Sequence, residues 1–400
     1  MTLNSWSYGL LLAVALFASW LVPGWAGTWV LLALSIVFYA WGTPSDLLVL
    51  APLLLAVHAI ARRVQPGQPH ARRWLGFGVT LLVGSLVYYK YLGLLAEGVV
   101  GGAHLLGFDL PLAAPRLQAP LGISFFVFLL IHYLVEVGRG SVQPVGLRDE
   151  SLFVLFFPTV VSGPLKRIEA FEPQLRAPGR PIPDDLHEGL SRIVIGLAKK
   201  MVVADQLAPL CARVFAKPDR YEWVELWLAS YGYALQIYFD FSGYSDIAIG
   251  SARLLGFRVP ENFDYPYFRT NIAQFWRHWH MTLTGWILQY VYIPLGGNRR
   301  GEIRSNWNRF AAMALCGLWH GSAFHFAVWG MYHGVLLNLY HAYTRLRARL
   351  RPSQPQGSAH PAVRFASGLL TFHAVVVGWV LFAVDLDEAL PILGRMLLLT

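Results

Sequence analysis

Residues 316–330 read CGLWHGSAFHFAVWG, an apolar segment that contains no Asp, Glu, Lys or Arg and is flanked by further apolar sequence. It carries two histidines, His320 and His325. An ionisable side chain within a bilayer is costly and is usually tied to function. His320, which lies between Trp319 and Gly321, is therefore the first candidate for a functional residue.

The composition predicts an all-α membrane protein that crosses the bilayer several times. Hydrophobic residues make up 56% of the chain and charged residues 14%, whereas soluble domains carry about 25% charged residues. No charged residue precedes Asp46. A membrane-spanning helix makes all of its backbone hydrogen bonds within its own segment, so apolar spans of this kind are expected to be helices.

The net charge of +9 does not indicate nucleic-acid binding. The basic residues fall in short clusters between apolar runs, which is the distribution of cytoplasmic loops in membrane proteins. We therefore expect residues 62–73 and 345–351 on the cytoplasmic side. Two cysteines, Cys211 and Cys316, form neither a disulfide framework nor a zinc-binding spacing.

A bilayer core takes roughly 20 apolar residues per helix, which predicts about ten to twelve spanning or re-entrant helices. They are expected near residues 5–22, 28–41, 46–61, 74–95, 121–137, 186–210, 221–241, 274–293, 307–319, 323–346 and 362–384. Loops are expected from about residue 96 to Pro120 and from Ser162 through Lys166, Arg167, Arg176 and Arg180. By organisation we divide the chain into N-terminal membrane helices (1–120), a core (121–346), and a basic loop with a C-terminal helix (347–400).

The middle of the chain breaks the pattern of a membrane helix. Polar side chains occupy alternate positions at the end of an apolar run, at Asp240, Ser242 and Tyr244, and Asn262 follows 18 residues after Tyr244. Polar, irregular backbone at membrane depth survives where it is enclosed by protein or lines a cavity. Residues 239–300 are therefore expected to form short or re-entrant segments around a funnel. The cluster at 275–280, FWRHWH, adds Arg277, Trp279 and His280 to its lining.

Three ordered blocks carry a family resemblance: 239–267 (FDFSGYSDIAIGSARLLGFRVPENFDYPY), 275–298 (FWRHWHMTLTGWILQYVYIPLGGN) and GLWHGSAFHFAVWG, which ends at Gly330. They resemble the membrane-bound O-acyltransferase family, most closely its bacterial alginate O-acetylase branch. That resemblance implies a ring of transmembrane and re-entrant helices around a central funnel. It also implies His320 as the catalytic histidine and His280 as the second one. Relatives commonly have two arginines where this chain has Arg277 and His278.

The resemblance further implies a function and its setting. An acyl group, expected to be acetyl, passes from a cytoplasmic thioester (acetyl-CoA or an acyl carrier) to a hydroxyl across the membrane, for O-acetylation of an exported polysaccharide such as alginate. The setting is a bacterial inner membrane with its lipid, and the partner is an extracytoplasmic SGNH-type protein that handles the acetyl group. No bound cofactor or metal and no nucleic acid is expected.

The residues themselves fit this chemistry. Attack by a hydroxyl on a thioester needs a base, and histidine suits that role at neutral pH. Burial in apolar surroundings favours the neutral imidazole, which can accept the proton. The developing oxyanion needs a fixed donor, for which His280 and Trp279 are the candidates.

Alternatives stay open at this point. Cys316 and His320 share a helix face, as a thiol–imidazole pair would, and a metal site would draw on His320, His325 and His333. Asp240 and Asp246 could be paired carboxylates, and Arg299 with Arg300 could meet donor phosphates. His132 and Glu136, four residues apart, are either a polar pair packed between helices or part of a cavity wall. A transporter or flippase of a lipid- or glycan-linked substrate would show a similar architecture.

Overall fold

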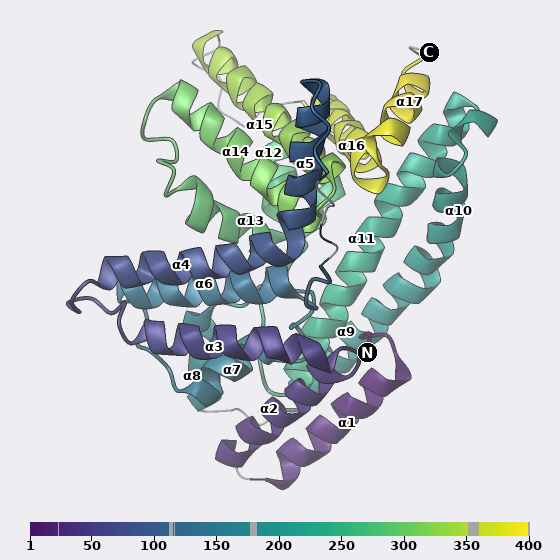
Figure 1. Cartoon of the computed structure of the whole chain (residues 1–400). Coiled ribbons are helices and arrows are strands. Elements are labelled where there is room, and N and C mark those ends of the chain that lie inside the picture. The colour runs from purple at the N-terminus through teal and green to yellow at the C-terminus, as the bar shows by residue number, and fades with distance from the viewer. Residues whose placement is uncertain (23, 112–114, 116, 177–181, 351–359, 399–400) are drawn as a thin grey trace. The chain divides into compact units, whose positions relative to one another are not determined.

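The structure is a computed structural model, and it describes all residues except 23, 112–114, 116, 177–181, 351–359 and 399–400 (Figure 1). The described residues form helices and connecting turns and contain no strand, which confirms the prediction of an all-α protein. The predicted position of Arg180 lies outside the described residues.

The α-helices in chain order are α1 (Trp6–Leu21), α2 (Gly24–Ala40), α3 (Leu47–Ala61), α4 (Ala71–Leu86), α5 (Leu92–Leu105), α6 (Ile123–Arg139), α7 (Leu147–Leu155), α8 (Ile168–Arg176), α9 (Pro183–Leu197), α10 (Asp205–Phe215), α11 (Trp223–Leu254), α12 (Ile272–His278), α13 (Met281–Ile287), α14 (Glu302–His320), α15 (Phe324–Leu350), α16 (Pro361–Ala383) and α17 (Leu386–Met396). Short 3-10 helices are η1 (Pro44–Asp46), η4 (Pro218–Arg220) and η5 (Pro266–Phe268), and π-helical turns are η2 (Val87–Tyr91), η3 (Ala198–Ala204) and η6 (Leu288–Tyr292).

Three helical segments in the described part are long and apolar enough to cross a membrane: Pro44–Ala61, Ala71–Leu105 and Pro361–Ala383. Two shorter apolar helices cover Trp6–Ala18 and Ala26–Ala40. Large apolar side chains such as Trp6, Phe17 and Leu370 are mostly exposed on these helices. Outward-facing apolar side chains are what lipid contact requires, because hydrocarbon offers polar groups no partners.

The chain forms two compact units, each described here by itself. The first unit comprises Met1–Ala198 with Gly243–Pro260, and the second comprises Lys199–Ser242 with Glu261–Thr400. Helix α11 contributes its N-terminal part to the second unit and its C-terminal part to the first. The three-part division made from the sequence follows chain order and stays a prediction.

In the first unit, glycines let α9 touch the C-terminal part of α11. A methyl group added at Gly196 would lie 2.6 Å from the carbonyl oxygen of Gly243, and one at Gly250 would lie 2.5 Å from that of Gly189. On each helix the two glycines are seven residues apart and hence on one face. Small residues at such spacings allow membrane helices to approach backbone to backbone.

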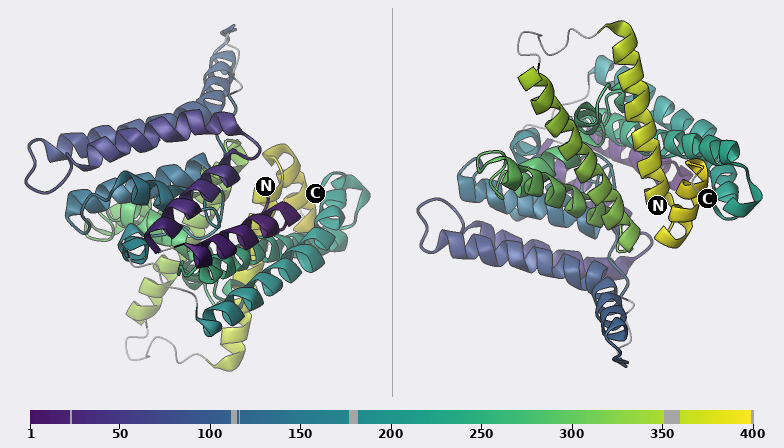
Figure 2. Two further views of the ribbon diagram at one scale, coloured as in Figure 1. Left: turned by 90° about the horizontal axis from the view of Figure 1, so that it is seen from below. Right: turned by 90° about the horizontal axis from the view of Figure 1, so that it is seen from above.

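In the second unit, α14 and α15 form a close antiparallel pair, visible as neighbouring green ribbons in Figures 1 and 2. A methyl group at Gly317 would collide with the carbonyl oxygen of Phe326, and one at Gly330 with that of Met313. The absence of these two side chains therefore sets the spacing of the pair. Helix α15 also contacts α16.

The sequence-based boundaries were wrong in four places. Helix α11 continues past Asp240 to Leu254, so residues 239–254 are not a short re-entrant segment. The two carboxylates do not end it because Lys200 lies 2.6 Å from Asp240 and Arg192 lies 3.2 Å from Asp246. Helices α5 and α8 occupy parts of the two predicted loops.

The fourth error concerns the helix expected over residues 274–293. It is divided into α12 and α13, because His280 adopts the left-handed conformation (φ 43°, ψ 52°) and interrupts the run. A non-glycine residue in this region costs about 1–3 kcal/mol and persists where its surroundings enforce it. The expectation of short segments is therefore met here, C-terminal to α11.

Replacing Gly317 or Gly330 by alanine is expected to force α14 and α15 apart, because the added methyl group meets backbone that cannot rotate away. Overpacking of this kind costs about 1–3 kcal/mol. Thermal unfolding of the detergent-solubilised protein measures it. The matched control is Gly368→Ala in α16, where nothing lies within 4 Å; equal melting temperatures for all three variants would contradict the prediction.

Candidate functional site

Two histidines from separate helices come together in the second unit. His320 is the last residue of α14, and His280 directly precedes α13. Their ring centroids are 6.5 Å apart. His280 is 1% exposed, whereas His320 is partly exposed. The pair predicted from the sequence is therefore within one site, with one ring sealed and the other accessible.

Aromatic rings surround His320. Trp319, Trp329 and Phe382 meet its ring edge-on at centroid distances of 4.9, 5.3 and 5.1 Å. Trp319 was among the predicted lining residues. Trp329 lies in the same apolar stretch and could have been chosen from it. Phe382, at the end of α16, has no sequence signal, because only packing brings that helix beside α15.

His280 is held by its backbone, by rings and by Asn262. The ring of Phe241 lies 4.7 Å away and that of Trp319 5.7 Å away, both at steep angles. The Nδ1 atom of His280 lies 3.3 Å from Oδ1 of Asn262, which is 0% exposed. Its Nε2 atom is buried and makes no hydrogen bond to any described residue.

Trp279 lies one ring away from the group around His320, because Trp379, which it contacts, packs against Trp329 and Phe382 at 5.6 and 5.5 Å. The ring of Trp279 packs against Phe263, Phe275 and Trp379 at 5.1, 5.6 and 4.8 Å. Tyr267, at 5.7 Å, links Trp279 to an apolar pocket of about 670 Å³ formed by α11, η5 and α16. Trp279 therefore contacts a residue that lines the pocket but does not line the pocket itself. Neither His280 nor His320 lines it.

The other predicted lining residues are dispersed. Ser242 is buried, and its hydroxyl has no hydrogen-bond partner in the described part of the chain. Tyr244 belongs to the first unit, where its ring faces Gly163. Arg277 is exposed at the end of α12. Asp240 pairs with Lys200 within the second unit, and Asp246 pairs with Arg192 within the first.

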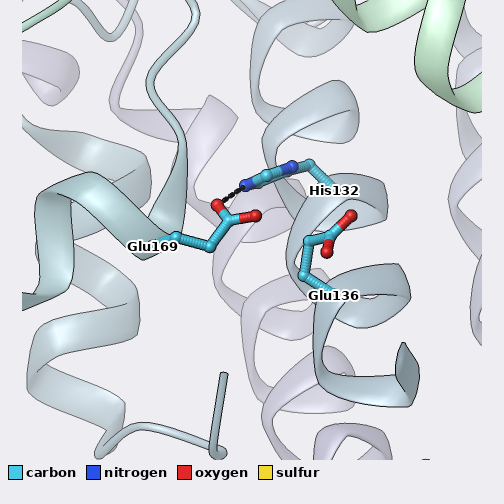
Figure 3. A group of neighbouring side chains, drawn as sticks. All are labelled: His132, Glu136 and Glu169. Carbon is cyan, nitrogen blue, oxygen red and sulfur yellow. Dashed lines mark ion pairs between the residues drawn. The ribbon is translucent and has the colours of Figure 1, made fainter. Parts of the chain in front are cut away.

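A second polar cluster, in the first unit, consists of His132, Glu136 and Glu169 (Figure 3). Nε2 of His132 accepts a hydrogen bond from the backbone N–H of Ile168 (2.9 Å) and lies 3.1 Å from Oε2 of Glu169. Glu136 pairs with Arg139 at 2.7 Å. The contacts of His132 tie α6 to α8, whereas the ion pair of Glu136 lies within α6.

The histidines that a metal site would have shared with His320 have other surroundings. Nδ1 of His325 lies 2.7 Å from Oδ1 of Asp385. His333 is 0% exposed and is enclosed by rings that include Trp276 and Trp329, at 5.0 and 5.1 Å.

Comparisons with known proteins place this chain among bacterial acyl-transferring relatives. A probable alginate O-acetylase of Pseudomonas putida is 37% identical over 376 residues, which cover 92% of this chain and 74% of the relative. A peptidoglycan O-acetyltransferase of Helicobacter pylori is 31% identical over 92% of this chain and 73% of its own. A teichoic acid D-alanyltransferase of Bacillus subtilis is 29% identical over 66% of this chain and 68% of its own.

The model of the membrane-bound O-acyltransferase family matches residues 51–377, a range that contains both His280 and His320. It covers well over half of the chain, and the two bacterial O-acetylating relatives match over nearly its whole length. The all-α architecture with its apolar helices is that of a membrane protein. The chain therefore belongs to the membrane-bound O-acyltransferase family and is an O-acyltransferase.

Proposed function

We propose that this O-acyltransferase takes an acetyl group from a cytoplasmic thioester, acetyl-CoA or an acyl carrier, and passes it across a bacterial inner membrane for O-acetylation of an exported polysaccharide such as alginate. The observation that carries the proposal is the pairing of a sealed and an accessible histidine inside an apolar membrane protein. The names of two relatives, an alginate O-acetylase and a peptidoglycan O-acetyltransferase, support a polysaccharide as the final acceptor.

In the proposed reaction His320 is the general base. Its neutral imidazole takes the proton of the acceptor hydroxyl while the hydroxyl oxygen bonds to the thioester carbonyl carbon. The carbon–sulfur bond then breaks, and the departing thiolate takes the proton from the imidazolium. The surrounding rings of Trp319, Trp329 and Phe382 limit access of water, which would otherwise hydrolyse the thioester.

The membrane setting of the proposal follows from charge. Residues 62–73 and the arginines at the end of α15 (Arg345, Arg347 and Arg349) mark the cytoplasmic side by the positive-inside rule. The chain crosses the membrane several times, so that donor and acceptor reach His320 from opposite faces. An extracytoplasmic SGNH-type partner then delivers the acetyl group to the glycan.

Replacing His320 by alanine is expected to lower O-acetylation of the envelope polysaccharide by about 10²–10⁴-fold, the usual contribution of a positioned base. The measurement is ester-linked acetate released by mild alkali from glycans of cells that make equal amounts of membrane-inserted protein. The matched control is His278→Ala, since His278 hydrogen-bonds the backbone oxygen of Gln274 and lies outside the histidine pair. Unchanged acetylation in the His320 variant would favour a transporter or flippase.

Replacing Cys316 by alanine is expected to leave turnover per folded molecule unchanged. The thiol is 2% exposed within α14, and direct transfer to the hydroxyl needs no acyl-enzyme. Initial rates with labelled acetyl donor in reconstituted vesicles test this. Complete loss of activity in a variant that melts like the native protein would instead indicate a covalent acyl-cysteine intermediate.

A further inference from the structure

The Nε2 atom of His280 is a buried polar atom to which the described residues offer no hydrogen bond. Leaving such an atom without a partner costs about 1–3 kcal/mol. The backbone adds strain at the same residue, which is left-handed at φ 43°. An unsatisfied and strained residue in a family of enzymes calls for a functional explanation.

The hydrogen-bond pattern shows which nitrogen of His280 carries the proton. The backbone N–H of Thr282 points to Oδ1 of Asn262 at 3.3 Å, and the Thr282 hydroxyl donates to the same atom at 2.6 Å. A backbone N–H can only donate, so the amide atom that faces it must be the oxygen. The same oxygen lies 3.3 Å from Nδ1 of His280, which must therefore be the protonated nitrogen.

In the neutral ring, Nε2 is then a hydrogen-bond acceptor. A neutral His280 in this tautomer has no free N–H for the oxyanion, a role for which the sequence had made it a candidate. Two backbone hydrogen bonds hold this arrangement in place. The backbone N–H of Met281 donates to the backbone carbonyl oxygen of Asn262 (2.9 Å), and that of Asp264 donates to the backbone carbonyl oxygen of His278 (3.1 Å). Asn262 therefore fixes both the position and the tautomer of His280.

The ring of His320 is a nearby source of a donor, at a centroid distance of 6.5 Å. Nε2 is buried and makes no hydrogen bond to the described residues. When His320 accepts a proton at one nitrogen, its other nitrogen carries an N–H. Catalytic hydrogen bonds are often long in empty sites and tighten when substrate is bound.

We propose that Asn262 and His280 are positioning residues for His320: Asn262 holds His280 with Nε2 unprotonated, and Nε2 accepts the N–H of His320 as the substrates close the site. This contact fixes which nitrogen of His320 receives the hydroxyl proton, and it stabilises the imidazolium that forms. A base oriented by a third group is a general feature of activated hydroxyl chemistry. The inference rests on the proposed role of His320 as the base.

Asn262→Asp tests the proposal with little change of shape. A carboxylate still accepts from Thr282 and from Nδ1 of His280, so activity at high pH is expected to stay close to that of the native enzyme. The negative charge stabilises protonated His280, whose Nε2 can no longer accept a hydrogen bond. The acidic limb of the pH–rate profile is therefore expected to move to higher pH. An unchanged profile overturns the proposal.

Asn262→Leu removes the acceptor and frees the tautomer. We expect kcat to fall by about 10- to 100-fold, the range lost when outer partners of ligand histidines are removed. KM for the hydroxyl acceptor is expected to change little, because in the proposed arrangement Asn262 and His280 act through His320. A rise in KM with unchanged kcat would instead place His280 on the substrate. The matched control is Asn298→Ala, an exposed asparagine of the same unit, for which native kinetics are expected.

The tautomer itself is measured without turnover. Nitrogen NMR of ¹⁵N-histidine-labelled protein in membranes, with the His280 signals assigned by their loss in His280→Gln, is expected to show protonated Nδ1 and unprotonated Nε2. A protonated Nε2 in the neutral native protein overturns the inference whatever the activity. Retained acetylation in His320→Ala would overturn the proposed function and leave this tautomer result standing, so the two failures can be told apart.

Discussion

The close approach of α14 and α15 is the constraint on which the site depends. Gly317 and Gly330 let the two backbones touch, and this contact brings Trp329 of α15 against the ring of His320 at the end of α14. Apolar side chains gain little from leaving lipid, so membrane helices associate through such tight packing rather than through the hydrophobic effect. The glycine pairs of α9 and α11 use the same device in the first unit.

Several polar groups in each unit have identifiable partners. Asp240 pairs with Lys200, His325 with Asp385, and Glu136 with Arg139. Glu136 is buried, and desolvation makes a buried charge costly unless it is paired, whereas Asp240 is half-exposed and Asp385 is exposed. Other buried polar atoms make no hydrogen bond within the described residues, among them Nε2 of His280 and both ring nitrogens of His333. His280 differs from His333 in its left-handed backbone and in the contact of its Nδ1 atom with Asn262.

Much of the helical content was predictable. Most apolar runs became helices close to their predicted ranges, because length and composition alone decide whether a segment can satisfy its backbone in a bilayer. The predictions failed where neighbours changed the outcome. Lys200 and Arg192 neutralise carboxylates that were expected to end α11, and the left-handed His280 divides a run that reads as one helix. Neither effect is local in sequence, so periodicity cannot show it.

The sequence by itself determined the membrane class, the helical architecture, and the two histidines as the candidate site, because hydropathy and rare intramembrane polar residues are properties of single segments. Only the tertiary structure decided that Phe382 and Trp329 enclose His320, that Trp279 reaches these rings through Trp379, and that Asn262 contacts Nδ1 of His280. These features arise from contacts between segments far apart in the chain. Such contacts depend on helix spacing and side-chain direction, which no single segment encodes.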